Sequence, residues 1–256
     1  MTGALRIVQR NALVYRRMWH SSVFLSFLQP LLFLTALGIG LGRMIDGGGA
    51  QLPGSVSYLA FLGPGLLAAT CMQTASFESA FPITGKMTWH RNYDAITATP
   101  MGIRDVILGE LGWMAARLLM VASAFMIVLT GFHVPRSPLA LLAIPAAVLT
   151  GLAFSAPIMA YAATRKSGGS FNGLFRFVIT PLFLFSGVFF PVSRLPIRLQ
   201  FIPWFTPLFH GVELVRGLTL NRLQSPSWIV HVAYLVCMLM AGIVVSLRTF
   251  RRKLRA

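Results

Sequence analysis

The stretch SWIVHVAYLVCMLMAGIVVSL, residues 227–247, is followed directly by RTFRRKLR, residues 248–255. The first stretch contains no Asp, Glu, Lys or Arg, and its length matches the roughly 20 residues that a helix needs to cross a bilayer. The second stretch is rich in Arg and contains no acidic residue. An apolar run with a basic end is typical of a transmembrane helix whose basic end faces the cytoplasm.

The composition of the 256-residue chain also indicates a membrane protein. Apolar residues make up 56% and charged residues 11%, whereas a soluble domain has about 25% charged residues. The net charge of +16 would favour nucleic-acid binding in a soluble protein, but here Lys and Arg flank the apolar runs. We therefore expect membrane lipid rather than nucleic acid as the partner of the basic residues, and an all-α integral membrane fold.

Long runs that are nearly free of charged residues predict six transmembrane helices. The expected spans are residues 21–42, 56–82, 108–130, 139–163, 171–190 and 227–247. Basic residues are concentrated before the first span and after the second, fourth and sixth. This asymmetry predicts that both termini are cytoplasmic. We expect one membrane domain to fill the chain.

Two segments are expected to lie at the membrane without spanning it. Residues 1–20 resemble a basic amphipathic helix in the cytoplasmic interface, with Arg6, Arg10 and Arg17 near one face and Leu5, Val8 and Ala12 on another. The external segment 191–226 is unusually apolar, and Pro203 and Pro207 divide it. We expect it to form two re-entrant half-helices; an interfacial helix on the outer leaflet is the alternative.

Few residues in the chain could carry out catalysis. The nearest approach to a P-loop is Gly85-Lys86-Met87, which lacks the Ser or Thr and the upstream glycine that a phosphate cradle requires. No two histidines have the i, i+4 spacing of a metal site. We therefore expect neither an enzyme nor a metal or cofactor site in this chain.

Three charged residues at or near membrane depth are candidates for function: Glu78, Glu110 and Arg117. An ionisable group inside a span is costly unless it has a partner or water, so it is often functional. The structural alternative is that these residues pair across helices or snorkel.

The cytoplasmic segment 84–105 mixes aromatic, basic and small residues, including Trp89, Arg91, Tyr93, Asp94 and Thr99. Pro100 favours a stop and Gly102 a turn back into the third span. A short helix here would suit docking of a soluble partner; a solvated connector is the alternative.

Two sequence patterns resemble a known family. One comprises Phe185-Ser186-Gly187, Phe190-Pro191 and Leu195-Pro196, followed by Pro207, Leu208, His210, Glu213 and Arg216; the other is residues 92–101, with an aromatic-acidic pair before Thr-Pro. Over nearly its whole length the chain resembles the membrane permease of type 2 ABC exporters, in the branch that exports lipo-oligosaccharides, polysaccharides and drugs.

The resemblance implies a permease in the inner or plasma membrane of a prokaryote, which pairs with a second permease copy or homologue and docks two ATPase subunits. ATP and Mg would then bind to the partner chains. Trp89, Arg91, Tyr93, Asp94 and Thr99 would contact the ATPase. His210, Glu213 and Arg216 follow one another at i+3, so we expect an ion pair within the hairpin rather than a substrate contact.

The expected function is therefore ATP-driven export of an amphiphilic or lipid-linked substrate. An ion-gradient-driven secondary transporter is the alternative, with Glu78 or Glu110 as the carrier acid.

Overall fold

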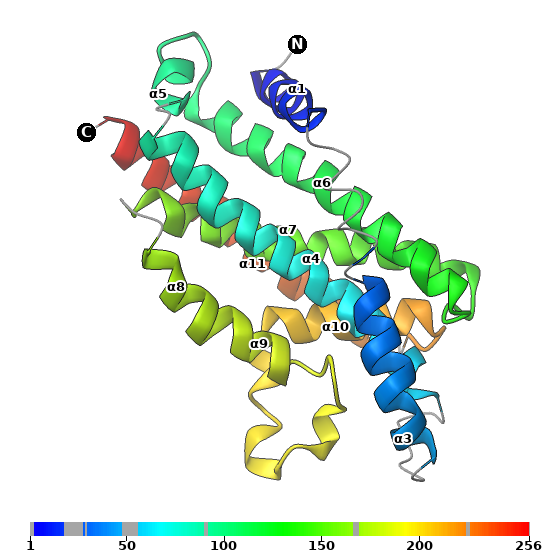
Figure 1. Ribbon diagram of the computed structural model, residues 1–256. Helices are drawn as coiled ribbons and strands as arrows, with labels where there is room; N and C mark the ends of the chain where they lie inside the picture. Colours follow the sequence, from blue (N-terminus) through cyan, green and yellow to red (C-terminus); the bar gives the residue numbers. More distant parts are fainter. Residues whose placement is uncertain are drawn as a thin grey trace.

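The computed structural model describes residues 3–17, 28, 30–47, 56–89, 92–165, 169–223 and 226–255, and the regular structure in these ranges is helical throughout (Figure 1). The α-helices are α1 (Gly3–Tyr15), α3 (Gly42–Gly47), α4 (Tyr58–Thr84), α5 (Asn92–Thr97), α6 (Ile103–Gly131), α7 (Ala143–Ala163), α8 (Ser170–Leu174), α9 (Thr180–Phe185), α10 (Pro207–Thr219) and α11 (Ser227–Arg255). Segments of π-helix occupy Leu34–Leu41, Gly85–Trp89 and Phe175–Ile179, and a 3₁₀ turn at Pro138–Leu142 precedes α7.

Three helical stretches in the described ranges are long and apolar enough to cross a membrane: Ile103–Gly131, Pro138–Thr164 and Ser227–Leu254. They coincide with the spans expected at 108–130, 139–163 and 227–247. Shorter apolar helical stretches at Pro30–Ile45 and Ser170–Phe185 overlap the expected first and fifth spans. The expected helical fold is confirmed for the described residues, and the count of six spans stays a prediction.

Helix α4 lies at the centre of the bundle, where it contacts α6, α7 and α10 (Figure 1). Its sequence is rich in Ala and Gly and its buried residues lie on all sides, from Tyr58 to Thr84. A helix that is apolar all round is typical of such an enclosed position. This helix corresponds to the expected second span, and it connects the two ends of the molecule.

Small residues allow α4, α7 and α11 to approach closely. A Cβ atom on Gly151 of α7 would lie 3.0 Å from the Cys71 carbonyl oxygen of α4, and one on Gly242 of α11 would lie 2.7 Å from the Pro157 nitrogen of α7. Close backbone approach through small residues is a common way for helices to pack in membranes.

Helix α1 packs along α6 (Figure 1), and its expected position in the membrane interface stays a prediction. Ile7 and Asn11 are buried in this contact, whereas Leu5 and Ala12 of the expected apolar face are exposed. Gly109 of α6 explains the choice of face, because a Cβ atom there would lie 2.7 Å from the Ile7 Cβ. Because Gly109 has no side chain, Ile7 fits against it and α1 packs closely on α6.

The external segment differs from the expected pair of half-helices. It contains three 3₁₀ turns, Val192–Arg194, Ile197–Leu199 and Pro203–Phe205, and then a single α-helix, α10. Prolines recur too closely before residue 207 for an α-helix to form, whereas Pro207 occupies a first-turn position of α10, where its missing N–H has no cost. The 3₁₀ turns project from the bundle, and α10 packs against α4, α7 and α11 (Figure 1).

Candidate functional site

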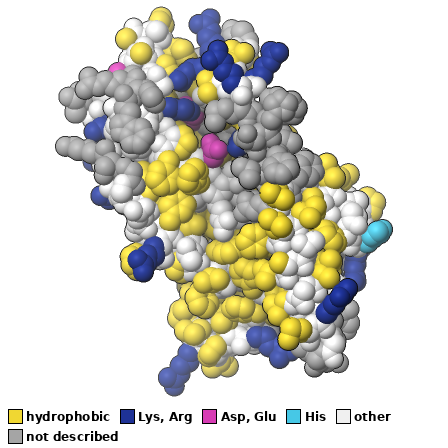
Figure 2. Space-filling model, in the orientation of Figure 1, with side chains coloured by type: hydrophobic (Ala, Val, Ile, Leu, Met, Phe, Trp, Pro, Cys, Tyr) yellow, Lys and Arg dark blue, Asp and Glu magenta, His cyan; other side chains and the backbone are white. Residues whose placement is uncertain are grey.

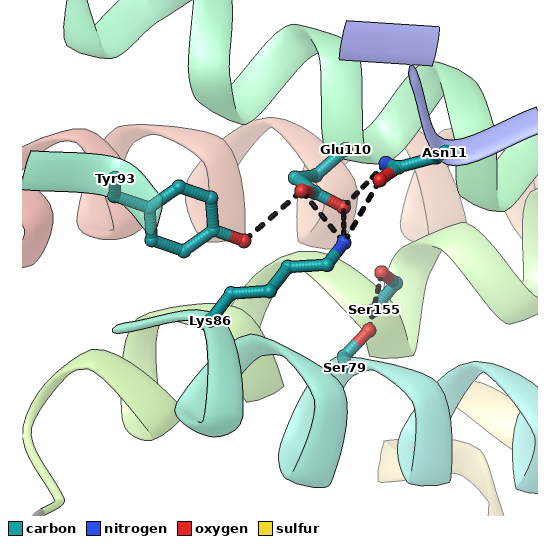
Figure 3. A network of polar contacts seen from close by, with 6 residues as sticks. All are labelled: Asn11, Ser79, Lys86, Tyr93, Glu110 and Ser155. Atoms are coloured by element: carbon teal, nitrogen blue, oxygen red, sulfur yellow. Dashed lines mark hydrogen bonds and ion pairs between the residues drawn. The ribbon is translucent and has the colours of Figure 1, made fainter. Parts of the chain in front are cut away.

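The carboxylate of Glu110, on α6, is the centre of a polar network at the end of the bundle that carries both termini (Figure 3). Lys86 Nζ lies 2.8 Å and 2.7 Å from its two oxygens. Asn11 Nδ2 donates to Oε2 at 3.0 Å, and the Tyr93 hydroxyl donates to Oε1 at 3.0 Å. Lys86 also donates to Asn11 Oδ1 at 3.2 Å. One carboxylate therefore joins α1, the 85–89 segment, α5 and α6.

Burial makes the partners of Glu110 necessary. Its side chain is 4% exposed, while that of Lys86 is 19% exposed and still reaches water. A buried charge without a partner costs several kcal/mol, and a fully satisfied network tends to fix one arrangement. The four donor contacts to the Glu110 oxygens meet this requirement, so the network holds the four segments in register.

Tyr93 points into the bundle rather than towards the surface of the molecule. Its side chain is fully buried, and its ring lies 5.8 Å from that of Phe250 on α11. Burial, and secondly the charge of Glu110, raise the pKa of the Tyr93 hydroxyl well above its ordinary value. The hydroxyl is therefore a neutral donor to Glu110 at all physiological pH values. Tyr93 links α5 to the bundle from within.

The other candidate docking residues are distributed around this anchor. Asp94 and Thr99 are exposed, and the Thr99 hydroxyl donates to the Ile96 carbonyl at 2.6 Å. Trp89 ends the π-helical segment, and Arg91 lies outside the described residues. The structure thus gives the segment an exposed side at Asp94 and Thr99 and an inner side at Tyr93.

A second ion pair lies further along α4 and α6. Arg117 Nη2 lies 3.4 Å from Glu78 Oε1, and its guanidinium carbon lies 4.5 Å from the centre of the Tyr15 ring of α1. Glu78 and Arg117 therefore pair across helices, as the structural alternative predicted. Glu110 instead pairs with Lys86, which is not among the site residues predicted from the sequence.

Asn11 and Lys86 are the members of the network that sequence reasoning missed. Lys86 follows the second expected span closely, so the need of Glu110 for a cation at the same membrane depth could have indicated it. Asn11 lies on α1, and nothing in its local sequence distinguishes it. Its contact depends on how α1 packs on α6.

At the opposite end of α4, Arg216 fastens α10 to its neighbours. Its Nη1 lies 2.8 Å from Glu213 Oε1, which is the expected i, i+3 ion pair. It also donates through Nη2 to the Gly187 carbonyl at 2.8 Å and through Nε to the Phe61 carbonyl at 3.2 Å. Arg216 can approach α4 closely because residue 65 is a glycine. A Cβ atom at this position would lie 3.1 Å from Arg216 Nη2. Arg216 therefore holds three segments together.

His210 contacts a second histidine that lies far away in sequence. Its Nδ1 is 2.8 Å from His231 Nδ1 on α11, and its Nε2 is 2.9 Å from the Trp204 carbonyl oxygen. A carbonyl only accepts, so His210 Nε2 donates; in the neutral ring Nδ1 then accepts from His231 Nδ1–H. Burial lowers the pKa of His210, which favours this neutral state. The pair joins α10 to α11.

No group of three or more His, Cys, Asp or Glu side chains suited to a metal ion occurs within the described ranges.

Comparison with known proteins matches residues 3–220 to the family described as ABC-2 type transporter. The chain is also similar to proteins called nodulation protein J. It is 31% identical over 250 residues to that of Rhizobium leguminosarum bv. viciae, covering 98% of this chain and 94% of the relative. It is 31% identical over 252 residues to that of Rhizobium meliloti, covering 98% and 93%.

Proposed function

Because the chain belongs to the ABC-2 type transporter family, we propose that it is the permease subunit of an exporter driven by ATP hydrolysis in separate partner chains. The observation that carries this proposal is the Glu110 network, since it ties the short cytoplasmic helix α5 to α1 and α6. A partner that moves α5 would therefore also move α1 and α6. Two ATPase subunits and a second permease copy or homologue complete the proposed exporter.

The surface around α5 supports docking of a soluble partner. Asp94 and Thr99 are exposed on it, and a hollow of about 320 Å³ lies beside Thr99, between the start of α1 and the turn at residues 99–101. The hollow is lined by both a cation and an anion, Arg6 and Asp105. A partner could insert one polar side chain there while it contacts α5. We assign this surface to the ATPase.

The charge distribution supports a cytoplasmic position for this end. The end that carries both termini includes the basic residues Arg248, Arg251, Arg252 and Lys253 of α11. Lys and Arg side chains also lie at the opposite end, and hydrophobic side chains cover much of the face between the two ends (Figure 2). Basic segments are typical of the cytoplasmic side. We propose that the chain lies in the plasma membrane of a prokaryote with both termini in the cytoplasm.

The pairing of the acidic residues favours an ATP-driven exporter over an ion-driven transporter. Glu110 is in contact with Lys86 at 2.7 Å, and Glu78 with Arg117 at 3.4 Å. Each carboxylate thus has a structural partner on another segment, and neither is needed as the carrier acid of an ion-driven transporter. For the exporter we propose an amphiphilic or lipid-linked cargo, in line with the lipo-oligosaccharide branch that the sequence resembles.

Affinity purification of the tagged chain from native membranes tests this function. We expect a soluble P-loop ATPase to co-purify in equal copy number, as measured by quantitative mass spectrometry. The substitution Asp94→Ala should reduce this recovery, while Arg198→Ala, at an exposed position in the external segment, should not. A stable chain without an ATPase, under conditions that preserve other membrane complexes, would contradict the proposal.

A further inference from the structure

A cavity of about 860 Å³ lies at the end of α4 opposite the Glu110 network. Its walls come from the start of α4, the 3₁₀ turns, α10 and the start of α11. This volume is within the range of about 300–1,000 Å³ that is typical of small-molecule sites. The cavity is therefore large enough for a ligand that carries several polar groups.

Two guanidinium groups give the cavity a positively charged wall. Arg216 and Arg222 both line it. Arg216 is held in this wall by its contacts with Glu213 and with the carbonyls of Phe61 and Gly187. Guanidinium groups bind phosphate through charge-assisted hydrogen bonds, often in bidentate geometry. This part of the wall therefore suits the phosphate group of a ligand.

The turn that follows α10 brings Arg222 to the cavity. Asn221 has a φ of 55°, in the left-handed region that Asn adopts more readily than most residues. The N–H of Arg222 donates to the Gly217 carbonyl at 2.7 Å, which closes the end of the helix. Arg222 is exposed, so its guanidinium is accessible to a ligand that approaches from outside the bundle.

A carboxylate and two indole rings in the same cavity suit a cationic group. Glu213 lines the cavity, and its side chain is 39% exposed although Oε1 contacts Arg216. Trp204 and Trp228 also line the cavity, and they are 53% and 42% exposed. An ammonium group is attracted both to a carboxylate and to the face of an indole ring. The wall thus has a place for a positive charge close to the place for a phosphate.

A ligand with a single charge matches this wall poorly. An isolated anion would meet the repulsion of Glu213, and an isolated cation would meet that of both guanidinium groups. A phosphate and an ammonium group joined by a short linker can each lie beside a group of opposite charge. Such an arrangement of complementary charges gives a site its specificity.

The position of the cavity indicates a membrane lipid as the source of these groups. The cavity lies at the start of the apolar stretch Ser227–Leu254, which is long enough to cross a bilayer. Trp residues are enriched where such helices meet the surface of the bilayer, and Trp228 has this position. The next residues, Ile229 and Val230, are exposed and apolar. The acyl chains of a lipid held in the cavity by its headgroup would have apolar surface beside them.

From this combination of charges, indole rings and position, we propose that the cavity binds the headgroup of a zwitterionic phospholipid. The phosphate lies at Arg216 and Arg222, and the ammonium group lies at Glu213 and the indole rings. The lipid is a resident ligand that joins the 3₁₀ turns, α10 and α11, and it is not the exported molecule. The inference goes beyond the proposed function, because it depends neither on the ATPase nor on the cargo.

Titration of the full-length chain with lipid tests the site. The chain, with any subunits that co-purify, is delipidated in detergent and titrated with dioleoylphosphatidylethanolamine, and native mass spectrometry measures the bound lipid. Dioleoylphosphatidylglycerol has the same acyl chains and phosphate but no ammonium group, and phosphoethanolamine has the headgroup without chains. We expect saturable binding of phosphatidylethanolamine that is about fivefold or more tighter than that of phosphatidylglycerol. Phosphoethanolamine should bind more weakly than the whole lipid.

Substitutions assign the two ends of the headgroup. Arg222→Gln should weaken the binding of both phospholipids about fivefold or more, because it removes a cation from the phosphate. Trp228→Leu should weaken the binding of phosphatidylethanolamine alone, because it removes an indole face from the ammonium group. If that variant unfolds, Glu213→Gln provides the same comparison. Arg198→Gln is the matched control, since Arg198 is exposed in the external segment but does not line the cavity.

Two results would overturn the inference: equal affinity for phosphatidylethanolamine and phosphatidylglycerol, or binding that Arg222→Gln leaves unchanged. Binding of phosphoethanolamine as tight as that of the whole lipid would overturn the assignment to a membrane lipid. Recovery of the ATPase is measured separately. A chain that binds this lipid but has no ATPase would contradict the export function alone, and a chain that has its ATPase but shows no lipid selectivity would contradict the lipid site alone.

Discussion

Removing the ammonium group of Lys86 tests two roles of the Glu110 network. One is its contribution to the stability of the fold, and the other is its contribution to coupling between the ATPase and transport. The substitution Lys86→Met keeps the length of the side chain but deletes the cation that lies 2.7 Å from the carboxylate. Loss of one partner of a buried ion pair costs about 3–5 kcal/mol. Asn11 and Tyr93 still donate to Glu110, and water reaches residue 86, so we expect the lower end, about 3 kcal/mol.

The double variant Lys86→Met/Glu110→Met provides the decisive comparison. Replacing both charges by apolar groups of similar size is often close to neutral, so the double variant should be more stable than Lys86→Met alone. Asn11 and Tyr93 then lose their common acceptor, which costs about 1–3 kcal/mol. The single variant Glu110→Met completes the cycle, and the interaction between the two substitutions should be about 0.5–3 kcal/mol.

Reversible unfolding in detergent micelles, followed by far-UV circular dichroism, would measure these free energies. Transport by reconstituted vesicles that contain the ATPase would measure coupling. We expect the double variant to fold and to bind the ATPase but to transport poorly, because α5 no longer contacts α6 through Tyr93. Additive free energies, or normal transport by the double variant, would refute the role given to this network.

Four further predictions follow from individual contacts. Tyr93→Phe should cost about 1.5–3 kcal/mol of unfolding free energy, because it deletes a hydrogen bond to the charged Glu110; an unchanged midpoint in the same unfolding assay would contradict this. Arg216→Lys should loosen the hairpin, since an ammonium cannot reproduce three directed contacts; faster hydrogen exchange in α10 would show it, and wild-type protection would count against it. The lowered pKa of His210 means that its neutral form stabilises the fold above about pH 6.5, and that this stability is lost as the pH falls through the lowered value; exchange in α10 should rise on acidification, and His210→Gln should weaken that dependence. For this test the neighbouring His231, Glu213 and Tyr234 need to be retained. Gly242→Leu should prevent assembly of the bundle, since even a Cβ would lie 2.7 Å from a backbone nitrogen of α7; normal yield of folded protein on gel filtration would contradict it.

Long apolar runs made the helices α6, α7 and α11 predictable, because burial in lipid requires a length and composition that are visible locally. The ion pair of Glu213 and Arg216 was predictable for a similar reason, since an i, i+3 spacing places both on one side of a helix. These features depend on neighbouring residues in the sequence.

Contacts between distant segments were not accessible in this way. His210 and His231 meet because α10 packs on α11, and Asn11 reaches Glu110 because Gly109 admits α1. Tyr93 looked like a surface residue in a loop, and only the position of Glu110 explains why its ring points inwards. The 3₁₀ turns at residues 192–205 were not predictable from Pro203 and Pro207 alone, because Pro191 and Pro196 also interrupt the segment.

The contacts at Gly151 and Gly242 also limit how the protein can move. With backbone of one helix against backbone of the next, α4, α7 and α11 can neither rotate nor slide by one residue without placing a side chain where only a hydrogen fits. These three helices therefore move as a single rigid body. In the proposed transport cycle, any opening would then occur at the boundaries of this unit, such as those with the α8–α9 segment and the 3₁₀ turns.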